Sequence, residues 1–408
     1  MGHDATPRAD AGHGGHAGSI RWQERGVLRN QIMSSSTSRQ PSPLSPKAFE
    51  ATASWLAAHQ KDSGEILWTL GGKSDPWDHV HAAMGLAAAG RIDAARAAYR
   101  FMARTQDENG AWAAERVGGA VTRATHETNH AAYLATGLCH FDQATRDRDF
   151  LREMWPTLER AIDWVVKLQL ESGAIAWAEK KGKVWRAPLI TGSSSVHGSL
   201  IAALRVAENL DYDRPLWRAA LARLTAVLRR PGKVFIDTDL PEKPGRHAMD
   251  FYYPVLGGAI RGHAGRELLT SSPDAAAFID ESLGCRCVRD QPWYTVAESS
   301  ELVLAFHAVG LSQRASEIFH WLQGQRDDDG AYWTGTTHPE KIRFPEGEKT
   351  TWTAATVLLA HDALMSETTA SDFFRTLDAN TVSIMRKRSI GERAPAARYD
   401  ELTTTPAE

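Results

Sequence analysis

Acidic side chains at the starts of several helix-like segments are the residues of this sequence best suited to chemistry. The candidates for a general acid and a general base are Glu127, Glu298 and Asp78, followed by Asp250 and Glu301. One carboxylic acid that gives a proton and one carboxylate that activates water are the groups that cleave a glycosidic bond. Glu127 lies between His126 and Asn129, which could tune its pKa for general acid work at neutral pH.

Polar and aromatic side chains near these acids could bind a polyhydroxylated ligand. Sugars require many hydrogen-bond partners and flat rings on which to stack. We predict ligand contacts from Asp75, Trp77, His79, His126, Asn129, His130, Ser194, His197, Tyr252, Tyr253, Trp293 and Trp352. Among them, His130 and His197 are candidate hydrogen-bond donors, and the tryptophans and Tyr253 are candidate stacking platforms.

Each of these residues also has a structural interpretation. Asp75, followed by Pro76, is a good helix N-cap, and capping is the favoured role for it. The helix dipole alone favours acids in or near a first turn, as at Glu127 and Glu298. The histidines and aromatics could belong to the core. Their convergence still indicates a binding site, because burying so many polar groups costs several kcal/mol unless they serve one another or a ligand.

The elements that must position these residues are segments with a polar start and a helix rich in small residues. They span 75–90, 125–138, 191–207, 249–262, 295–310 and 349–364. Ala and Gly on nearly all faces suit helices that are buried on every side. If these helices form an inner ring, their N-terminal ends open onto one mouth, and the polar residues meet there.

A second repeated unit separates these segments: an amphipathic helix, a Gln, a Gly turn and a Trp. The copies read WLAAHQKDSGEILW, FMARTQDENGAW, WVVKLQLESGAIAW and WLQGQRDDDGAYW, the last pairing Gln325 with Gly330. Gly supplies the left-handed conformation that ends a helix, and Trp folds back over that end. We interpret each copy as the end of an outer helix, with a degenerate outer helix at PLWRAALARLTAVLRRPG. The alternation predicts an all-α fold, an (α/α)6 toroid.

The chain has one predicted domain between two tails. Residues 1–45 and 371–408 are polar and lack apolar periodicity, so we expect disordered tails around a toroid at 46–370. Met33 is an alternative to Met1 as the translation start.

Composition excludes several classes of partner. The 47 basic and 50 acidic residues give a net charge of −3, with no basic stripe for nucleic acid. No apolar run reaches the about 18 residues of a membrane span, and the N-terminus lacks a secretory signal, so the expected location is the cytoplasm. Cys139, Cys285 and Cys287 are interpreted as reduced thiols, and no motif predicts a metal or cofactor. The oligomeric state is left open.

The Gln-Gly-Trp units resemble the repeats of terpenoid cyclases and protein prenyltransferases. That resemblance implies an isoprenoid substrate. The sequence departs from both families at their chemical motifs: IDTDL lacks the final Asp of the cyclase motif, and GCRCV does not reproduce the prenyltransferase zinc ligands.

A second resemblance covers roughly residues 50 to 365. DRDFLREMWPTLERAIDWVVKLQ, at 147–169, is similar to the outer-helix pattern of six-hairpin, glucoamylase-like glycosidases. PWDHVHAAMGLAAAGRIDAARAAYRFM resembles their first inner hairpin, with Trp77-Asp78-His79 in place of the usual Trp-x-Arg-Asp.

The acid-rich mouth favours the glycosidase resemblance, since a cavity that guides carbocations should be aromatic and nearly free of carboxylates. We therefore expect general acid/base cleavage of a glycosidic bond in a small molecule, oligosaccharide or glycolipid. The alternatives are a prenyltransferase or terpenoid-cyclase-like enzyme and a non-catalytic glycan-binding toroid.

Overall fold

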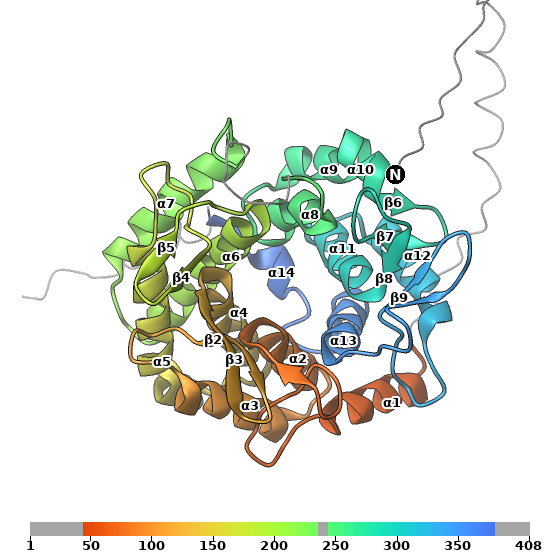
Figure 1. Cartoon of the computed structure of the whole chain (residues 1–408), viewed down its shortest axis with the longest axis horizontal. Helices are drawn as coiled ribbons and strands as arrows, with labels where there is room; N and C mark the ends of the chain where they lie inside the picture. Colours follow the sequence, from red (N-terminus) through yellow and green to blue (C-terminus); the bar gives the residue numbers. More distant parts are fainter. Residues whose placement is uncertain (1–43, 236–243, 380–408) are drawn as a thin grey trace, which may run out of the picture. The chain divides into compact units, whose positions relative to one another are not determined.

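The computed structural model of the protein describes residues 44–235 and 244–379, which belong to one compact unit. Helices of this unit alternate between an inner and an outer layer of a ring (Figure 1). The predicted N-terminal tail falls almost wholly outside the described residues, and so does most of the predicted C-terminal tail.

The inner layer, as far as the structure describes the chain, consists of α2 (Pro76–Ala88), α4 (Thr128–Thr145), α6 (Ile190–Asn209), α8 (Ala248–Leu256), α11 (Val296–Ala308) and α13 (Thr351–Met365). Each of these helices packs on the next, and α13 packs on α2, which closes the ring. They are buried on almost every face, as their small residues predict. The predicted (α/α)6 toroid is confirmed.

The outer layer consists of α1 (Pro46–Ala57), α3 (Ile92–Thr105), α5 (Arg148–Lys167), α7 (Pro215–Arg229), α9 (Gly262–Ser271) with α10 (Pro273–Phe278), and α12 (Ser312–Leu322), which runs into the 3-10 turn η1 (Gln323–Gln325). These helices are amphipathic and bury one face against the inner layer. The predicted degenerate outer helix is α7.

The repeated Gln-Gly unit joins neighbouring outer helices. Gln106 Nε2 donates to the carbonyl of Gly110 at 2.8 Å and to that of Thr157, on α5, at 2.9 Å. Gly110 has a φ of +95°, and a Cβ there would lie 2.4 Å from the carbonyl oxygen of Arg160. The unit therefore requires glycine both for its conformation and for its close approach to the next helix.

The same contacts recur in the copies at Gln60 and Gln169. The fourth copy differs from the prediction. There, Arg326 forms an isolated antiparallel β-bridge with Tyr332. In the first and third copies the same β-bridge joins Gln60 to Ile66 and Gln169 to Ile175. Gln325 therefore stands one residue before the repeated position.

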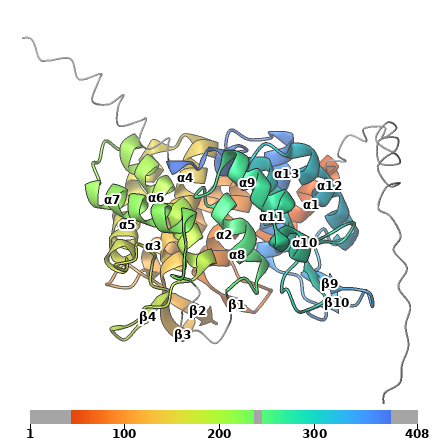
Figure 2. The ribbon, with the colours of Figure 1, turned by 90° about the horizontal axis from the view of Figure 1, so that it is seen from above.

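Two antiparallel five-stranded sheets, counted over the described residues, form from the loops that enter the inner helices. The first has the order β1 (Lys73–Ser74), β2 (Ala113–Val117), β3 (Ala120–Glu127), β4 (Ala178–Lys180) and β5 (Lys183–Trp185). The second has the order β10 (Arg343–Phe344), β9 (Gly335–Thr337), β8 (Trp293–Thr295), β7 (Gly284–Arg286) and β6 (Ile279–Asp280). Figure 2 shows strands of both sheets on one face of the ring.

Two predicted inner segments differ from the helices they contain. The polar start of the segment 125–138 is a strand, because β3 continues to Glu127 and pairs with β2 and β4, and α4 begins at Thr128. Helix α8 ends at Leu256 and not at 262, because the chain turns at Gly258, whose φ is +82°.

The short helix α14 (Phe373–Thr376) covers the C-terminal ends of several inner helices. Phe373, Phe374 and Leu377 are buried. Arg261, which follows α8, donates to the carbonyl oxygens of Phe374 and Leu377. The packed chain thus continues past residue 370, where the polar tail was predicted to begin, because this apolar segment closes one end of the ring.

Candidate active site

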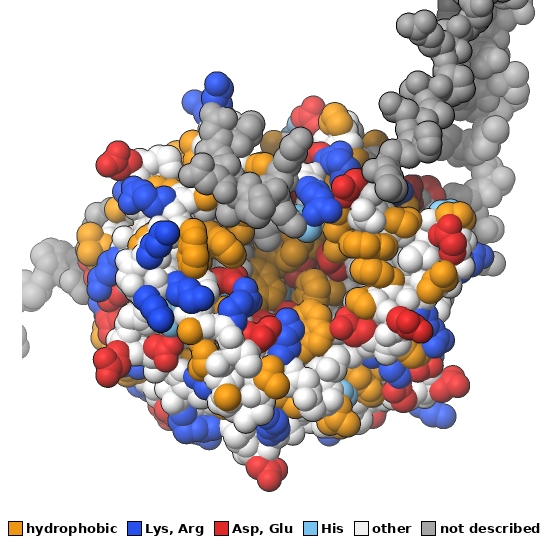
Figure 3. Space-filling view, viewed as in Figure 1, with side chains coloured by type: hydrophobic (Ala, Val, Ile, Leu, Met, Phe, Trp, Pro, Cys, Tyr) orange, Lys and Arg blue, Asp and Glu red, His pale blue; other side chains and the backbone are white. Residues whose placement is uncertain are grey.

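The face of the ring that carries the sheets is hollowed at its centre (Figure 3). The N-terminal turns of the inner helices open onto this face, since every inner helix is entered from it. Hydrophobic and acidic side chains are both visible in the hollow. We call this region the mouth.

Two carboxyl groups occupy adjacent positions where α2 begins. The Oδ1 atom of Asp75 accepts a hydrogen bond from the backbone N–H of Asp78 at 2.9 Å, so Asp75 caps the helix as predicted. Both side chains are buried. Burial, reinforced by the negative charge of Asp75, raises the pKa of Asp78 well above its usual range.

The pKa of Asp75 moves the other way. Burial alone would raise it, but the hydrogen bonds from Asp78 and the nearby His130 outweigh burial and lower the pKa. The pair thus favours one ionised and one protonated carboxyl group on a single turn. This is the division of states that general acid catalysis requires.

Glu301 on α11 forms the centre of a buried network. Its Oε2 accepts from the hydroxyl of Tyr252 at 2.5 Å, and its Oε1 accepts from that of Tyr253 at 2.7 Å. His81 Nε2 lies 3.3 Å from the same Oε1 and 2.7 Å from the hydroxyl oxygen of Tyr133. Burial and the charge of Glu301 raise the pKa values of both α8 tyrosines, which keeps them hydrogen-bond donors.

His81 and Tyr133 were missed as site residues. The signal was the helical period: each follows a predicted site residue, Trp77 or Asn129, by four positions and therefore lies on the same face of its helix.

Glu298 lies one helical turn before Glu301, closer to the mouth. It is buried beside the thiol of Cys287, which follows β7, and burial raises its pKa. Glu127, at the end of β3, is instead paired with Arg123 and His130. Arg123 Nη1 donates to its Oε1 at 2.8 Å, and His130 Nε2 lies 3.4 Å from its Oε2.

Trp77 stacks in the middle of these groups. Its ring lies 4.2 Å from that of Tyr133 at an interplanar angle of 19°, and 5.7 Å from that of Tyr253. His130 lies 6.4 Å from the same ring and has a buried Nδ1 without a hydrogen-bond partner. The structure thus brings together Trp77, Asp78, His130 and Tyr253, which the sequence had singled out.

The other predicted platforms lie towards the rim. Trp352, in the first turn of α13, is 6.2 Å from Trp68 and has a buried indole N–H without a partner. Trp293 on β8 stacks on Phe344 of β10 at 4.2 Å and 13°. Asn129 is half-buried in the first turn of α4, next to His130.

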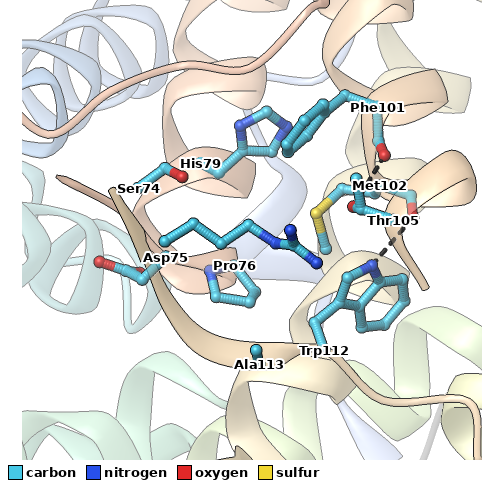
Figure 4. A pocket seen from close by; sticks show the side chains of 10 residues that line it. Ser74, Asp75, Pro76, His79, Phe101, Met102, Thr105, Trp112 and Ala113 are labelled. Atoms are coloured by element: carbon cyan, nitrogen blue, oxygen red, sulfur yellow. Dashed lines mark hydrogen bonds between the residues drawn. The ribbon is translucent and has the colours of Figure 1, made fainter. Parts of the chain in front are cut away.

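Three predicted histidines do not lie at the mouth. His79 Nδ1 accepts from the backbone N–H of Ile66, and its Nε2 lies 2.9 Å from the carbonyl oxygen of Ala98 on α3. Figure 4 shows His79 beside Phe101 on the wall of a separate pocket, from which the Asp75 carboxylate points away. His79 therefore packs between the two layers of the ring.

His126 points to the opposite side of β3 from Glu127, because side chains alternate along a strand. Its Nε2 lies 2.9 Å from Asp107 Oδ2. His197 bridges the carbonyl of Gly257 and the hydroxyl of Thr225, both at 2.8 Å, and burial lowers its pKa to about 4. These contacts give both histidines a structural role in place of the predicted ligand contact.

Asp250 serves the fold, and Ser194 is buried with a hydroxyl that has no hydrogen-bond partner. Asp250 accepts from the backbone and the hydroxyl of Thr191 with one oxygen and from the backbone of Gly245 with the other, which ties α6 to α8. Ser194 lies against α8, where its carbonyl closely approaches Gly257. Its neighbour Ser195 instead lines a cavity below Tyr133 and Tyr253.

The described residues offer no group of His, Cys, Asp and Glu arranged for a metal ion. The three cysteines form no disulfide. In the same part of the chain, no helix combines the length and apolarity needed to cross a bilayer.

The fold and the mouth define a protein of the six-hairpin α/α-toroid class. A structure titled "Glycosidase Wild Type" aligns with a TM-score of 0.60 and 14% identity over 78% of this chain and 96% of its own. A GH63 mannosylglycerate hydrolase from Thermus thermophilus aligns with a TM-score of 0.59 and 12% identity over 76% of this chain and 99% of its own. A D-mannose isomerase aligns with a TM-score of 0.55 and 11% identity over 80% of this chain and 99% of its own. These likenesses concern the fold.

Sequence similarity defines the family. The chain is 40% identical over 338 residues to an MMP endo-(1,4)-3-O-methyl-alpha-D-mannosidase from Mycolicibacterium hassiacum, covering 83% of this chain and 92% of the relative. The chain therefore belongs to the family of this glycosidase. No protein-family model matches it. The prediction of a glycoside hydrolase-like enzyme is confirmed, and the isoprenoid alternative is not favoured.

Proposed function

We propose that the protein hydrolyses α-mannosidic bonds within an oligosaccharide, with Asp78 as the general acid and Glu298 as the general base. The observation that carries this proposal is the Asp75–Asp78 pair, whose pKa values are moved apart at the start of α2. The α-mannoside substrate and internal cleavage come from the name of the relative.

The acid is chosen by protonation state. A general acid must hold a proton near neutral pH, and the pKa of Asp78 is raised well above the usual range by burial and by Asp75. Leaving-group protonation would convert Asp78 to a carboxylate beside an ionised Asp75, and the repulsion between them would favour reprotonation for the next cycle.

The base is chosen by position and by pairing. Glu298 lies in the first turn of α11, which α13 separates from α2 and Asp78 in the ring. Burial raises the pKa of Glu298, which makes it a better proton acceptor than an ordinary carboxylate. Glu127 is less suited, since Arg123 occupies one of its oxygens and His130 lies beside the other. We propose that Glu127 and His130 bind sugar hydroxyls.

Stacking groups support a ligand of several sugar units. Trp77 would carry the sugar at the cleavage point. The Trp293–Phe344 pair on the second sheet and the Trp177–Trp185 pair near the first, with ring centroids 5.9 Å apart, would hold units on either side.

The test is a turnover assay on α-1,4-linked manno-oligosaccharides with and without 3-O-methyl groups, read by mass spectrometry. Release of internal fragments by the wild-type protein, lost in Asp78→Asn, is the expected result. Binding of these glycans without turnover over long incubation would instead support the non-catalytic toroid. Saturable binding of a prenyl diphosphate with no affinity for glycans would overturn the proposal.

A further inference from the structure

We propose that Glu301 is a positioning residue: through Tyr253 and His81 it holds the Trp77 platform and the neighbouring Asp78, and it does not itself react with water or sugar. This inference rests on the proposed function, because it assigns a part in the same acid/base reaction.

The carboxylate of Glu301 has no oxygen available to a substrate. Each oxygen accepts a tyrosine hydroxyl, at 2.5 Å from Tyr252 and 2.7 Å from Tyr253, and His81 adds a third contact at 3.3 Å. The side chain is 0% exposed. A water molecule could reach Glu301 only by displacing one of these partners, which would leave a buried polar group unpaired.

The partners of Glu301 are also the neighbours of Trp77. The ring of Trp77 lies 5.7 Å from that of Tyr253 and 5.5 Å from that of His81. It stacks on Tyr133, whose hydroxyl meets His81. Glu301 thus fixes the walls that orient Trp77, and the next residue in the chain is Asp78.

The charge of Glu301 acts on Asp78 as well, because like charges in a buried site favour the protonated acid. The titratable groups that interact with Asp78 are Lys73 on β1, Asp75 before α2, Tyr133 on α4 and Glu301 on α11. Those that interact with Glu301 are Asp78 and His81 on α2, Tyr133 on α4, Tyr252 and Tyr253 on α8, Cys285 on β7 and Glu298 on α11.

The first experiment compares the pH profiles of kcat for wild type and Glu301→Gln. The alkaline limb of the profile reports deprotonation of the acid. Removing the charge of Glu301 should move this limb to lower pH and reduce kcat by about 10²-fold through misplacement of the platform. An unmoved limb would mean a purely structural role and would overturn the proposal. The proposal would also be overturned if Glu301→Ala lost all activity and azide or formate restored it, because Glu301 would then react directly.

A matched pair of variants tests the route through the aromatic wall. Tyr253→Phe and Tyr252→Phe each remove one hydroxyl from Glu301, but only the Tyr253 ring borders Trp77. Tyr253→Phe should raise KM clearly more than Tyr252→Phe does. Equal effects would overturn the proposed route, and this comparison holds even if the Glu301 variants fail to fold.

A measurement without turnover separates this inference from the proposed function. The raised pKa of Asp78 makes the folded protein keep a proton that the unfolded chain releases, so stability falls as pH rises above about 4. Asp78→Asn should remove part of this slope in Tm against pH, and Glu301→Gln should change the slope only when Asp78 is present. If the two substitutions change the slope of Tm against pH additively, Glu301 and Asp78 are not coupled and the inference is overturned, whether or not any glycan is cleaved.

Discussion

Asp75 caps helix α2 by accepting a hydrogen bond from the backbone of Asp78 at 2.9 Å, and the same contact holds their two carboxyl groups side by side. The helix cap and the pairing of the two carboxyl groups thus come from the same arrangement. The cap fixes the first turn, and the fixed turn sets the distance over which the charge of Asp75 raises the pKa of Asp78.

The Asp78→Asn variant tests the acid. We expect kcat to fall by about 10²–10⁴-fold, because a general acid contributes on that scale, while the helix remains capped. Asp93→Asn is the matched control, since Asp93 lies in the first turn of outer helix α3 with a 97% exposed side chain. Equal activity in both variants would rule out Asp78 as the acid.

The Asp75→Asn variant separates charge from capping. Asparagine is as good an N-cap as aspartate, so the free energy of unfolding should hardly change. Loss of the negative charge should lower the pKa of Asp78 and move the alkaline limb of the kcat profile to lower pH. Asp75→Ala should show the same shift and also lose about 1 kcal/mol of stability, measured by urea unfolding. An unchanged limb in Asp75→Asn would contradict the coupling.

The base is tested by comparing Glu298→Gln with Glu127→Gln. We expect Glu298→Gln to lower kcat by about 10²–10⁴-fold and to abolish the acidic limb of the pH profile. Glu127→Gln should mainly raise KM, since its partners Arg123 and His130 hold it as a binding group. The reverse pattern, measured on the same oligosaccharide, would exchange the two roles.

The repeated glycine is tested by Gly110→Ala. The new Cβ would meet the carbonyl oxygen of Arg160 at 2.4 Å in a backbone with φ of +95°. Gly118→Ala is the control, because Gly118 also has positive φ, at +60°, but open space around it. We expect urea unfolding to show that Gly110→Ala costs about 1–3 kcal/mol more, the typical penalty of overpacking. Equal losses would mean that φ alone requires the glycine.

The fold was predictable because its signals are local. A Gln that donates to a carbonyl four residues on, a glycine with positive φ in the turn after the helix and a helix of small residues can all be read within one segment. The glycine does not itself end the helix, as the repeat had suggested, because α3 already stops at Thr105. The β-strands were not predicted. The segment at β3 is held in a sheet by pairing with β2 and β4, and those partners come from elsewhere in the chain.

The sequence by itself determined the ring, the ends at which the polar residues gather and the capping role of Asp75, since these depend on helical period and local hydrogen bonds. Only the tertiary structure decided which side chains face the mouth. His79 and His81 are two residues apart on α2, yet one packs against α3 and the other reaches Glu301. The rotation of each helix is fixed by its neighbours in the ring, and that packing joins residues from α2, α4, α8 and α11 that no single segment contains.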